Sequence, residues 1–302
     1  MTQTNPPDPA TSNAASTPSP DPGVPVRRPG AAKLQRWWRR RTVVQLRPWV
    51  QALFAVLWLL PLRLKQAPTC VFHCDACPLA GFACPIGTLA RFSSAHMLPL
   101  LTIGVLVVVG MAVGSLVCGW ACPFGFLQDL LGRIPTPKVR LPNWLGLGRY
   151  MVLLTLVLWI PYQFGQESPL YVCSVCPAGA VEASLPRAGM AAAAGETIYW
   201  MSPQKAIITG VILIAALFVH RPWCTVLCPL GGILALFNRF SLFYLRFEAS
   251  GCSECNLCRS RCKYGVKVDQ SINNTSCIRC LECTACPGVR NALAPRSLDG
   301  EE

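Results

Sequence analysis

Long apolar stretches alternate with polar, cysteine-containing loops through most of the chain. Four stretches hold few charged residues: Trp49 to Leu62, Leu98 to Val117, Tyr150 to Phe164 and Ala206 to Val219. A helix needs about 20 apolar residues to cross a hydrocarbon core of about 30 Å, which the second stretch reaches alone and the others reach with their flanks. The pattern predicts an all-α membrane protein with four transmembrane helices.

The remaining segments differ in character. A fifth apolar run, Leu230 to Phe247, is interrupted by polar residues, so we expect a helix lying in the membrane interface there. The N-terminal segment is rich in Pro, Ser and Thr, which is typical of disorder. We therefore expect a disordered tail at 1–35, a membrane domain at 36–248, a small C-terminal domain at 249–290 and a flexible tail at 291–302.

Composition and charge fit this membrane prediction. Hydrophobic residues make up 52% of the chain, charged residues 14%, and the mean hydropathy is +0.40, which departs from ordinary globular proteins. The formal net charge is +13, but the basic residues lie mainly beside the apolar stretches, so nucleic acid is not expected as a partner. Their distribution predicts a multi-pass protein of a bacterial inner membrane, with both termini and the C-terminal domain cytoplasmic.

The apolar stretches and cysteine motifs form two repeats. Cys118-Gly-Trp-Ala-Cys122-Pro-Phe-Gly after the second stretch matches Cys224-Thr-Val-Leu-Cys228-Pro-Leu-Gly after the fourth, 106 positions later. Cys74-x2-Cys77-Pro before the second matches Cys173-x2-Cys176-Pro before the fourth, 99 positions later. We expect two helix pairs in the same orientation, related by an axis along the membrane normal.

The C-terminal cysteines have the spacing of a ferredoxin with two [4Fe–4S] clusters. Three cysteines separated by two-residue gaps wrap one cluster, and the fourth of each run ligates the other cluster. This predicts Cys252, Cys255, Cys258 and Cys286 on the first cluster and Cys277, Cys280, Cys283 and Cys262 on the second. The chain departs from the usual run at Lys263, where proline is common, and in a last gap of two residues.

These motifs together resemble the NapH-type membrane ferredoxins, which include MauN and NosR. The resemblance covers roughly residues 36 to 290 and rests on CGWACP, CTVLCP and the C-terminal cluster motifs. It implies an electron carrier between the quinol pool and periplasmic acceptors, with the CxxxCP pairs at the cytoplasmic side. Carried over residue by residue, the pairs are Cys118 and Cys122, and Cys224 and Cys228.

The CxxxCP cysteines also suggest a site of their own. Each pair supplies two thiolates at a helix end, and packing of the repeats would bring four together, enough for one [4Fe–4S] cluster at the inner face. A redox-active dithiol pair and a disulfide are the alternatives, although the reducing cytoplasm disfavours the disulfide.

The outward loops carry cysteines that the NapH type is not expected to have. By the repeat, Cys74, Cys77, Cys173 and Cys176 form a second membrane cluster at the outer face, with Cys84 as an alternative to Cys74. Cys70 completes this set of six, and three disulfides are the competing interpretation in an oxidising compartment.

Two function classes remain. The first is one-electron transfer between a cytoplasmic-side or quinone-pool donor and a partner oxidoreductase, without an independent catalytic constellation. The second is assembly or regulation of a respiratory metalloenzyme, as in CcoG-like or NosR-like proteins. His73, His96 and His220 are the histidines available to a quinone headgroup or a metal. The donor, the acceptor, the direction of electron flow and the oligomeric state do not follow from the sequence.

Overall fold

The computed structural model describes residues 31–58, 64–68, 82–197, 200–249, 252, 257–286 and 288–293. The first helix, α1, spans Ala31–Trp58. Most of both predicted tails lies outside the described residues, so these tails stay predictions. Cys70, His73, Cys74, Cys77 and Cys255 also lie outside them.

Helices dominate the described residues. The helices after α1 that form the body are α2 (Pro85–Ser94), α3 (Leu100–Val113), α4 (Leu116–Trp120), α5 (Pro123–Leu131), α6 (Gly148–Val152), α7 (Ile160–Phe164), α8 (Val172–Val175), α9 (Pro177–Gly179), α10 (Leu185–Ala194), α11 (Pro203–Phe218), α12 (Pro229–Leu236) and α13 (Leu257–Arg261). Short 3-10 or π segments extend them at η1 (Asn143–Leu147), η2 (Leu153–Trp159), η3 (Ala180–Ser184), η4 (Trp223–Leu227), η5 (Phe237–Arg239) and η7 (Glu282–Ala285).

Two small sheets complete the described elements. Strands β1 (Leu64–Pro68) and β2 (Phe82–Ala83) pair in parallel. Strands β3 (Phe243–Phe247) and β4 (Val289–Leu293) pair antiparallel, with Phe243 opposite Leu293.

The prediction of four transmembrane helices is wrong. Among the described residues, one helix is long and apolar enough to cross a membrane, the continuous run Asn143–Phe164. Helix α3 has 14 residues and α11 has 16, which at the helical rise correspond to only about 21 and 24 Å. Helix α3 stops because Gly114 takes φ 55°, and α11 stops where Val219 becomes extended. Hydropathy does not show either stop.

The interfacial helix predicted over Leu230 to Phe247 is also wrong in its second half. The run begins as α12, but Phe243 starts strand β3. Phe243 and Leu245 are buried while Arg246 is exposed, which is the alternation of a half-buried strand. The arginine that seemed to interrupt a helix is the outward-facing residue of this strand.

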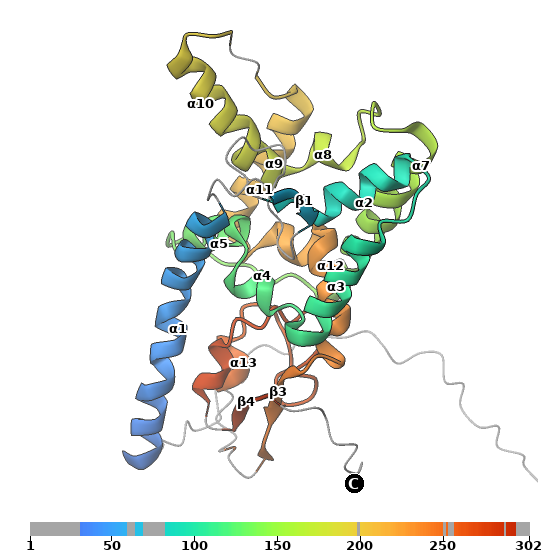
Figure 1. Cartoon of the computed structure of the whole chain (residues 1–302). Coiled ribbons are helices and arrows are strands. Elements are labelled where there is room, and N and C mark those ends of the chain that lie inside the picture. The colour runs from blue at the N-terminus through green and yellow to red at the C-terminus, as the bar shows by residue number, and fades with distance from the viewer. Residues whose placement is uncertain are drawn as a thin grey trace, which may run out of the picture.

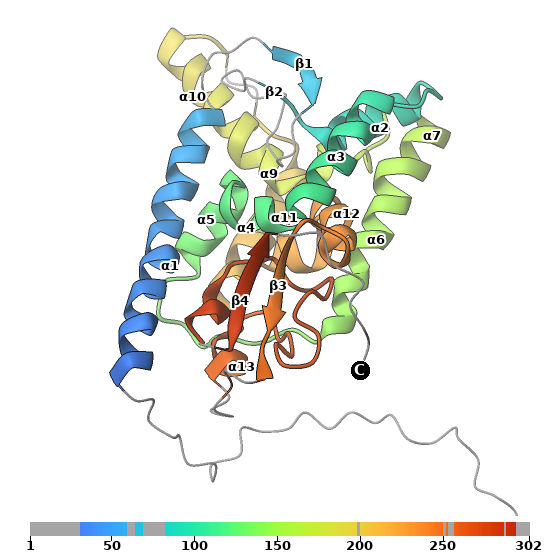
Figure 2. The ribbon, with the colours of Figure 1, turned by 60° about the horizontal axis from the view of Figure 1, so that its bottom comes forward.

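The elements lie in layers along one axis of the molecule. Strands β3 and β4 with α13 lie at one end, next to α4, and α10 lies at the other end (Figure 1). Helix α1 runs along one side, and α6 and α7 run along the opposite side in the rotated view (Figure 2). Elements far apart in sequence therefore meet in the middle, around α4, α5 and α12.

Cysteines make up much of the central core. Alongside Phe124, Trp223 and Leu234, this core contains six buried cysteines, namely Cys84, Cys118, Cys122, Cys176, Cys224 and Cys228, and Cys173 packs against it. A core that contains this many thiols is unusual for packing alone, because thiol reactivity rather than packing usually explains why a cysteine is present.

Candidate metal centre

The second cysteine of each CxxxCP motif caps a helix. Cys122 begins α5 and Cys228 begins α12, each with an extended backbone and a proline in the first helical turn. The amide of Gly125 donates to Cys122 Sγ at 3.4 Å, and that of Gly231 donates to Cys228 Sγ at 3.5 Å. A helix N-terminus has unpaired N–H groups and favours negative charge. Both sulfurs are therefore held where a thiolate is stabilised.

The glycines of the two motifs are needed for close packing. A Cβ at Gly125 would lie 3.3 Å from Cys118 O and 3.0 Å from the Arg221 guanidinium, and one at Gly231 would lie 3.1 Å from Cys224 O. The first cysteine of each motif is thus packed on the glycine that follows the second. The two motifs share this local geometry as well as their sequence.

The structure brings the four motif thiols together in one buried group. Burial raises the pKa of Cys122, and the neighbouring thiols of Cys224 and Cys118 raise it further. Burial also raises the pKa of Cys228, and it too interacts with the other three thiols. Four thiolates could not persist here without positive charge between them, and coordination to a metal removes the thiol proton outright.

Gln128 joins the two motifs. Its amide, on α5 of the first repeat, donates to Cys224 Sγ of the second at 3.2 Å, and its carbonyl accepts from the Trp223 amide at 3.2 Å. The side chain is almost completely buried. This contact could not be predicted from the repeat, because the equivalent position in the second repeat is Leu234.

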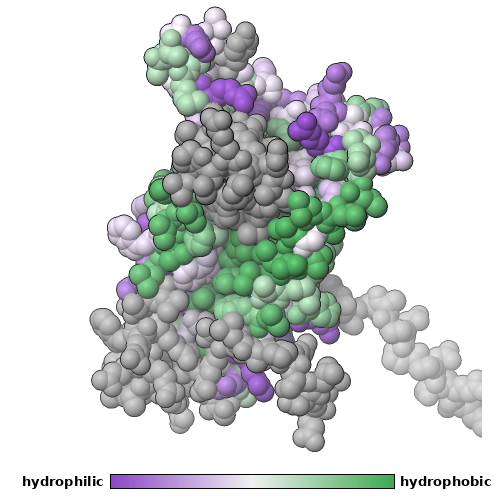
Figure 3. All heavy atoms as spheres, in the orientation of Figure 1, coloured by the Kyte–Doolittle hydropathy of each residue, from purple (hydrophilic) through white to green (hydrophobic). Residues whose placement is uncertain are grey.

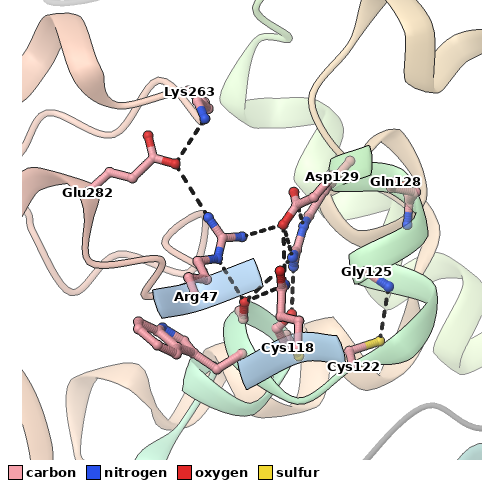
Figure 4. Close-up of polar contacts among 12 residues, drawn as sticks. Arg47, Cys118, Cys122, Gly125, Gln128, Asp129, Lys263 and Glu282 are labelled. Atoms are coloured by element: carbon pink, nitrogen blue, oxygen red, sulfur yellow. Dashed lines mark hydrogen bonds and ion pairs between the residues drawn. The ribbon is translucent and has the colours of Figure 1, made fainter. Parts of the chain in front are cut away.

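A buried ion network surrounds the Cys118 end of the site (Figure 4). Asp129 accepts from Arg221 at 2.6 Å and from Arg47 at 2.7 Å. Arg221 also donates to Cys118 O, and Arg47 donates to Gly119 O at 3.0 Å. Burial would raise the pKa of Asp129, but the two arginines outweigh it and lower the pKa to about 2. The carboxylate is therefore charged, and it pairs with both arginines.

Two buried arginines of the site have unusual backbones. Arg221 and Arg279 take φ values of 52° and 51°, the left-handed region that costs a residue with a side chain about 1–2 kcal/mol. Hydrogen bonds of the two side chains offset this cost. The Arg221 guanidinium donates to Cys118 O, and the Arg279 guanidinium donates to Val113 O at 2.9 Å and to Asn238 O at 2.6 Å.

The second predicted ferredoxin ligand set is also brought together. Burial raises the pKa of Cys277 to about 12 and of Cys280 to about 11, and the thiol of Cys262 contributes to both shifts. Cys283 interacts with all three. The spacing rule assigns Cys262 to this set; the four thiols lie near one another, and the ligand set itself stays a prediction.

The first predicted ferredoxin set is described only in part. A hydrogen bond with Cys286 is the largest cause of the raised pKa of Cys258, and both pack with Val268 and Val289. Cys252 is half-buried, and Cys255 lies outside the described residues. The predicted crossing of Cys286 to the earlier run is thus matched by its contact with Cys258.

Known proteins were compared with the chain. A family model described as a 4Fe-4S binding domain matches residues 94–142 and 206–247. The "Uncharacterized protein MJ0750" of Methanocaldococcus jannaschii is 30% identical over 189 residues, which cover 59% of this chain and 71% of that relative. The chain belongs to this 4Fe-4S family. The two matched segments contain Cys118 and Cys122, and Cys224 and Cys228.

Named relatives extend the comparison. The "Putative electron transport protein YccM" of Escherichia coli is 27% identical over 203 residues, covering 65% of this chain and 53% of that relative. The "Regulatory protein NosR" of Stutzerimonas stutzeri is 29% identical over 189 residues, covering 55% of this chain and 22% of that relative. The resemblance to the family of NosR is confirmed. No solved structure matches the chain.

The four-cysteine site fits the cluster of this 4Fe-4S family. Its donors are four thiols, and the amides aimed at their sulfurs are hydrogen bonds of the kind that tune cluster potentials. Within the described part of the chain, no three His, Cys, Asp or Glu side chains are close enough to share one metal ion.

Cys84 repeats the capping geometry of the family motif, and Cys176 repeats its backbone angles without the capping hydrogen bond. Cys84 begins α2 and accepts from the Gly87 amide at 3.5 Å, and Cys176 begins α9. Their backbone angles, φ −68° and ψ 124° for Cys84 and φ −73° and ψ 118° for Cys176, match those of Cys122 and Cys228. The sequence signal is Cys-Pro-x-Gly, which all four positions carry.

The described histidines have separate surroundings. His96 is exposed and stacks edge-on against Tyr162. His220 lines a cavity of about 30 Å³ with Arg149, Thr225 and Lys263. Burial lowers the pKa of His220, and the charges of Lys263 and Lys138 lower it further. Thr225 lies within the second CxxxCP motif, so this cavity opens beside the four-cysteine site.

Proposed function

We propose that the protein is a membrane-bound iron–sulfur electron carrier that passes single electrons between a cytoplasmic-side or quinone-pool donor and a partner oxidoreductase. The observation that carries this proposal is the group of four buried thiols of Cys118, Cys122, Cys224 and Cys228. The chain next to Cys118 is in contact with a ferredoxin-like segment. A relative named for electron transport, YccM, supports it.

The residues of the chain would hold and tune the clusters. When bound, [4Fe–4S] clusters supply one-electron chemistry without making or breaking bonds. Gly125, Gly231 and Gln128 donate to the sulfurs, which stabilises the more negative, reduced state. The surrounding apolar core excludes water. Two further clusters would be held by the ferredoxin-like segment.

A fourth cluster is part of the proposal. Cys84, Cys173 and Cys176 lie in or against the central core, and Cys84 and Cys176 have the backbone angles of the inner pair. In this proposal they serve the second membrane cluster, with its fourth ligand among the remaining outward cysteines. This favours Cys84 over Cys74 as a ligand.

Membrane attachment rests on a broad apolar surface. A green band of hydrophobic side chains crosses the middle of the molecule, between more polar ends (Figure 3). Large exposed residues on α1, α3, η2 and α11 contribute, among them Leu53, Val108, Leu154 and Ile214. An apolar surface of this extent is typical of contact with lipid or protein. We propose that it faces lipid, with Asn143–Phe164 as the crossing helix and the ferredoxin-like segment cytoplasmic.

A quinol donor has one candidate position. The cavity at His220 is lined by polar and apolar side chains and adjoins the second CxxxCP motif, and at about 30 Å³ it would have to widen to take a headgroup. A headgroup there would be close to the four-cysteine site.

Iron and sulfide counts of anaerobically purified protein test the proposal. Two ferredoxin-like clusters alone give about eight irons per chain, one further cluster gives about twelve, and two further clusters give about sixteen. The double variant Cys118→Ser/Cys224→Ser should lose about four irons while it keeps the ferredoxin-like signals in electron paramagnetic resonance (EPR). An unchanged iron count would refute a cluster at the buried site.

The outer-face cluster has its own control. The variant Cys84→Ser/Cys173→Ser should lose about four irons more than Ser174→Ala, a neighbouring change that removes no thiol. Equal iron in both variants would leave disulfides as the explanation of these cysteines.

A regulatory role is the second candidate, because NosR is named a regulatory protein. Deletion of the gene separates the two. An electron carrier leaves the amount of its partner oxidoreductase unchanged and lowers its turnover with the physiological donor, whereas an assembly or regulatory protein lowers the amount of mature partner.

A further inference from the structure

The loop Cys277 to Cys280 carries close contacts between the ferredoxin-like segment and the first CxxxCP region. Ser115 Oγ donates to Cys277 O at 2.7 Å, and Asn238 Nδ2 donates to the same oxygen at 2.8 Å. Trp120 Nε1 donates to Arg279 O at 3.2 Å. Ser115 and Trp120 flank Cys118, so the segment that carries one ligand set is fixed to the segment that carries the other.

Gly119 permits the closest part of this contact. A Cβ at Gly119 would lie 2.6 Å from Ile278 O and 3.3 Å from Arg279 O. A side chain at Gly119 does not fit 2.6 Å from Ile278 O. The oxygen belongs to the backbone, so it cannot move aside by a side-chain rotation. Gly119 directly follows Cys118, and Ile278 directly follows Cys277. The two main chains are therefore in contact at Gly119 and Ile278, and each of these residues is the sequence neighbour of a predicted cluster ligand.

Two arginines hold this contact from opposite sides. Arg279 extends from the loop into the core, where it donates to Val113 O and Asn238 O. Arg47 extends from α1 and donates both to Gly119 O at 3.0 Å and to Glu282 Oε1 at 3.3 Å. Both arginines are buried. The contact between the two segments is therefore part of the packed interior of the protein.

The other ferredoxin-like site adjoins this one on the side of Cys262 and Cys283. Cys258 and Cys286 pack with Val268 and Val289, and Cys262 and Cys283 pack against the same group. Cys277 packs against Leu281 together with residues of the core, namely Val113, Leu116 and Trp120. The side-chain hydrogen bonds just described between the CxxxCP region and the ferredoxin-like segment end on Cys277, Arg279 and Glu282. The Cys277 site is therefore nearer to the core than the Cys252 site is.

We propose that the site of Cys262, Cys277, Cys280 and Cys283 is the direct electron-exchange neighbour of the buried four-cysteine site, and that Gly119 is the positioning residue that sets their separation. This rests on the proposed function. In an exchange, one centre is oxidised and the other reduced by one electron, with no proton or bond changed. Because electron tunnelling weakens steeply with distance, a backbone displacement at Gly119 acts on this exchange directly.

The variant Gly119→Ala tests the positioning role, and Gly104→Ala is its matched control. The added methyl must push Ile278 away, whereas a Cβ at Gly104 meets nothing within 4 Å. Both variants should keep the wild-type iron count. In the fully reduced protein, the EPR splitting that arises from interaction between the two clusters should weaken in Gly119→Ala and remain in Gly104→Ala. Retained splitting in both would overturn the positioning role.

A second pair of variants tests the order of the sites without relying on Gly119. The splitting of the buried-site signal should disappear in Cys280→Ser and persist in Cys252→Ser. The reverse result would assign the neighbouring site to Cys252 and overturn the proposal. A failure of the proposed function is distinct, because an iron count of about eight in the wild type shows that the buried site holds no cluster.

Discussion

The Gln128 side chain donates to a sulfur across the two CxxxCP motifs. Its removal should destabilise the reduced, more negative state of a cluster at the site. In Gln128→Leu we expect the midpoint potential of the buried site to fall by about 40 mV, which corresponds to about 1 kcal/mol for a one-electron couple. Potentiometric EPR measures this shift. The exposed Gln166→Leu should leave the potential unchanged, and an equal shift in both variants would contradict the assignment.

Asp129 balances two buried arginines, whose side chains are 0% (Arg221) and 7% (Arg47) exposed. Its pKa is lowered to about 2 from an ordinary 3.8, so the charged carboxylate stabilises the fold by about 2.5 kcal/mol. This contribution is fully present above pH 3.8 and is lost as the pH falls through about 2. In Asp129→Asn we expect a loss of about 3 kcal/mol in the free energy of unfolding, equal at pH 7 and pH 5.

Denaturant titration of the detergent-solubilised protein measures that loss. The matched control is Asp269→Asn, because Asp269 pairs with Arg259 at the surface, where an ion pair contributes about 0.2–1 kcal/mol. If the two substitutions destabilise equally, or if the loss in Asp129→Asn changes between pH 7 and pH 5, the network does not act as described.

At the scale of elements, the crossing of α3 with η5 depends on a glycine. A Cβ at Gly110 would lie 2.4 Å from the ring of Phe237. In Gly110→Ala we expect the unfolding free energy to fall by about 1–3 kcal/mol, because the packed ring has to move. Gly104→Ala, on the same helix with open space, should instead gain up to about 1 kcal/mol from helix propensity. Thermal unfolding compares the two, and equal effects would contradict this helix crossing.

The elements also show how far sequence reasoning reached. The sequence placed the CxxxCP thiols at helix ends and expected the repeats to bring four of them together. It did not predict that α5 and α12 start directly after Cys122 and Cys228. The spacing rule put Cys258 and Cys286 in one ligand set, and the two side chains lie in contact, but the ligand set itself stays a prediction. The ends of α3 and α11 were missed, since Gly114 and Val219 change direction for reasons of tertiary packing. The ion pairs of Asp129 were missed because Arg47 and Arg221 are 82 and 92 residues away from it in the sequence.

At the scale of the whole molecule, two kinds of interaction could attach the protein to a membrane. The net charge of +13 would bind an anionic surface electrostatically. Salt weakens such binding, because the screening length of charges falls to about 3 Å at 1 M salt. The apolar band would bind through burial, which salt does not weaken. We expect the protein to stay in the membrane fraction through a 1 M salt wash and to be released by detergent. Release by salt alone would show that the apolar band does not contact lipid.

The contact between Gly119 and Ile278 has a consequence for the biogenesis of the protein. Translation produces both CxxxCP motifs before it reaches the Cys277 to Cys280 loop, so the Gly119 side of the motif has no cover from that loop while the chain is being made. Arg47 gains Glu282 only 235 residues later. Closure of this side therefore has to wait until nearly the whole chain has been made.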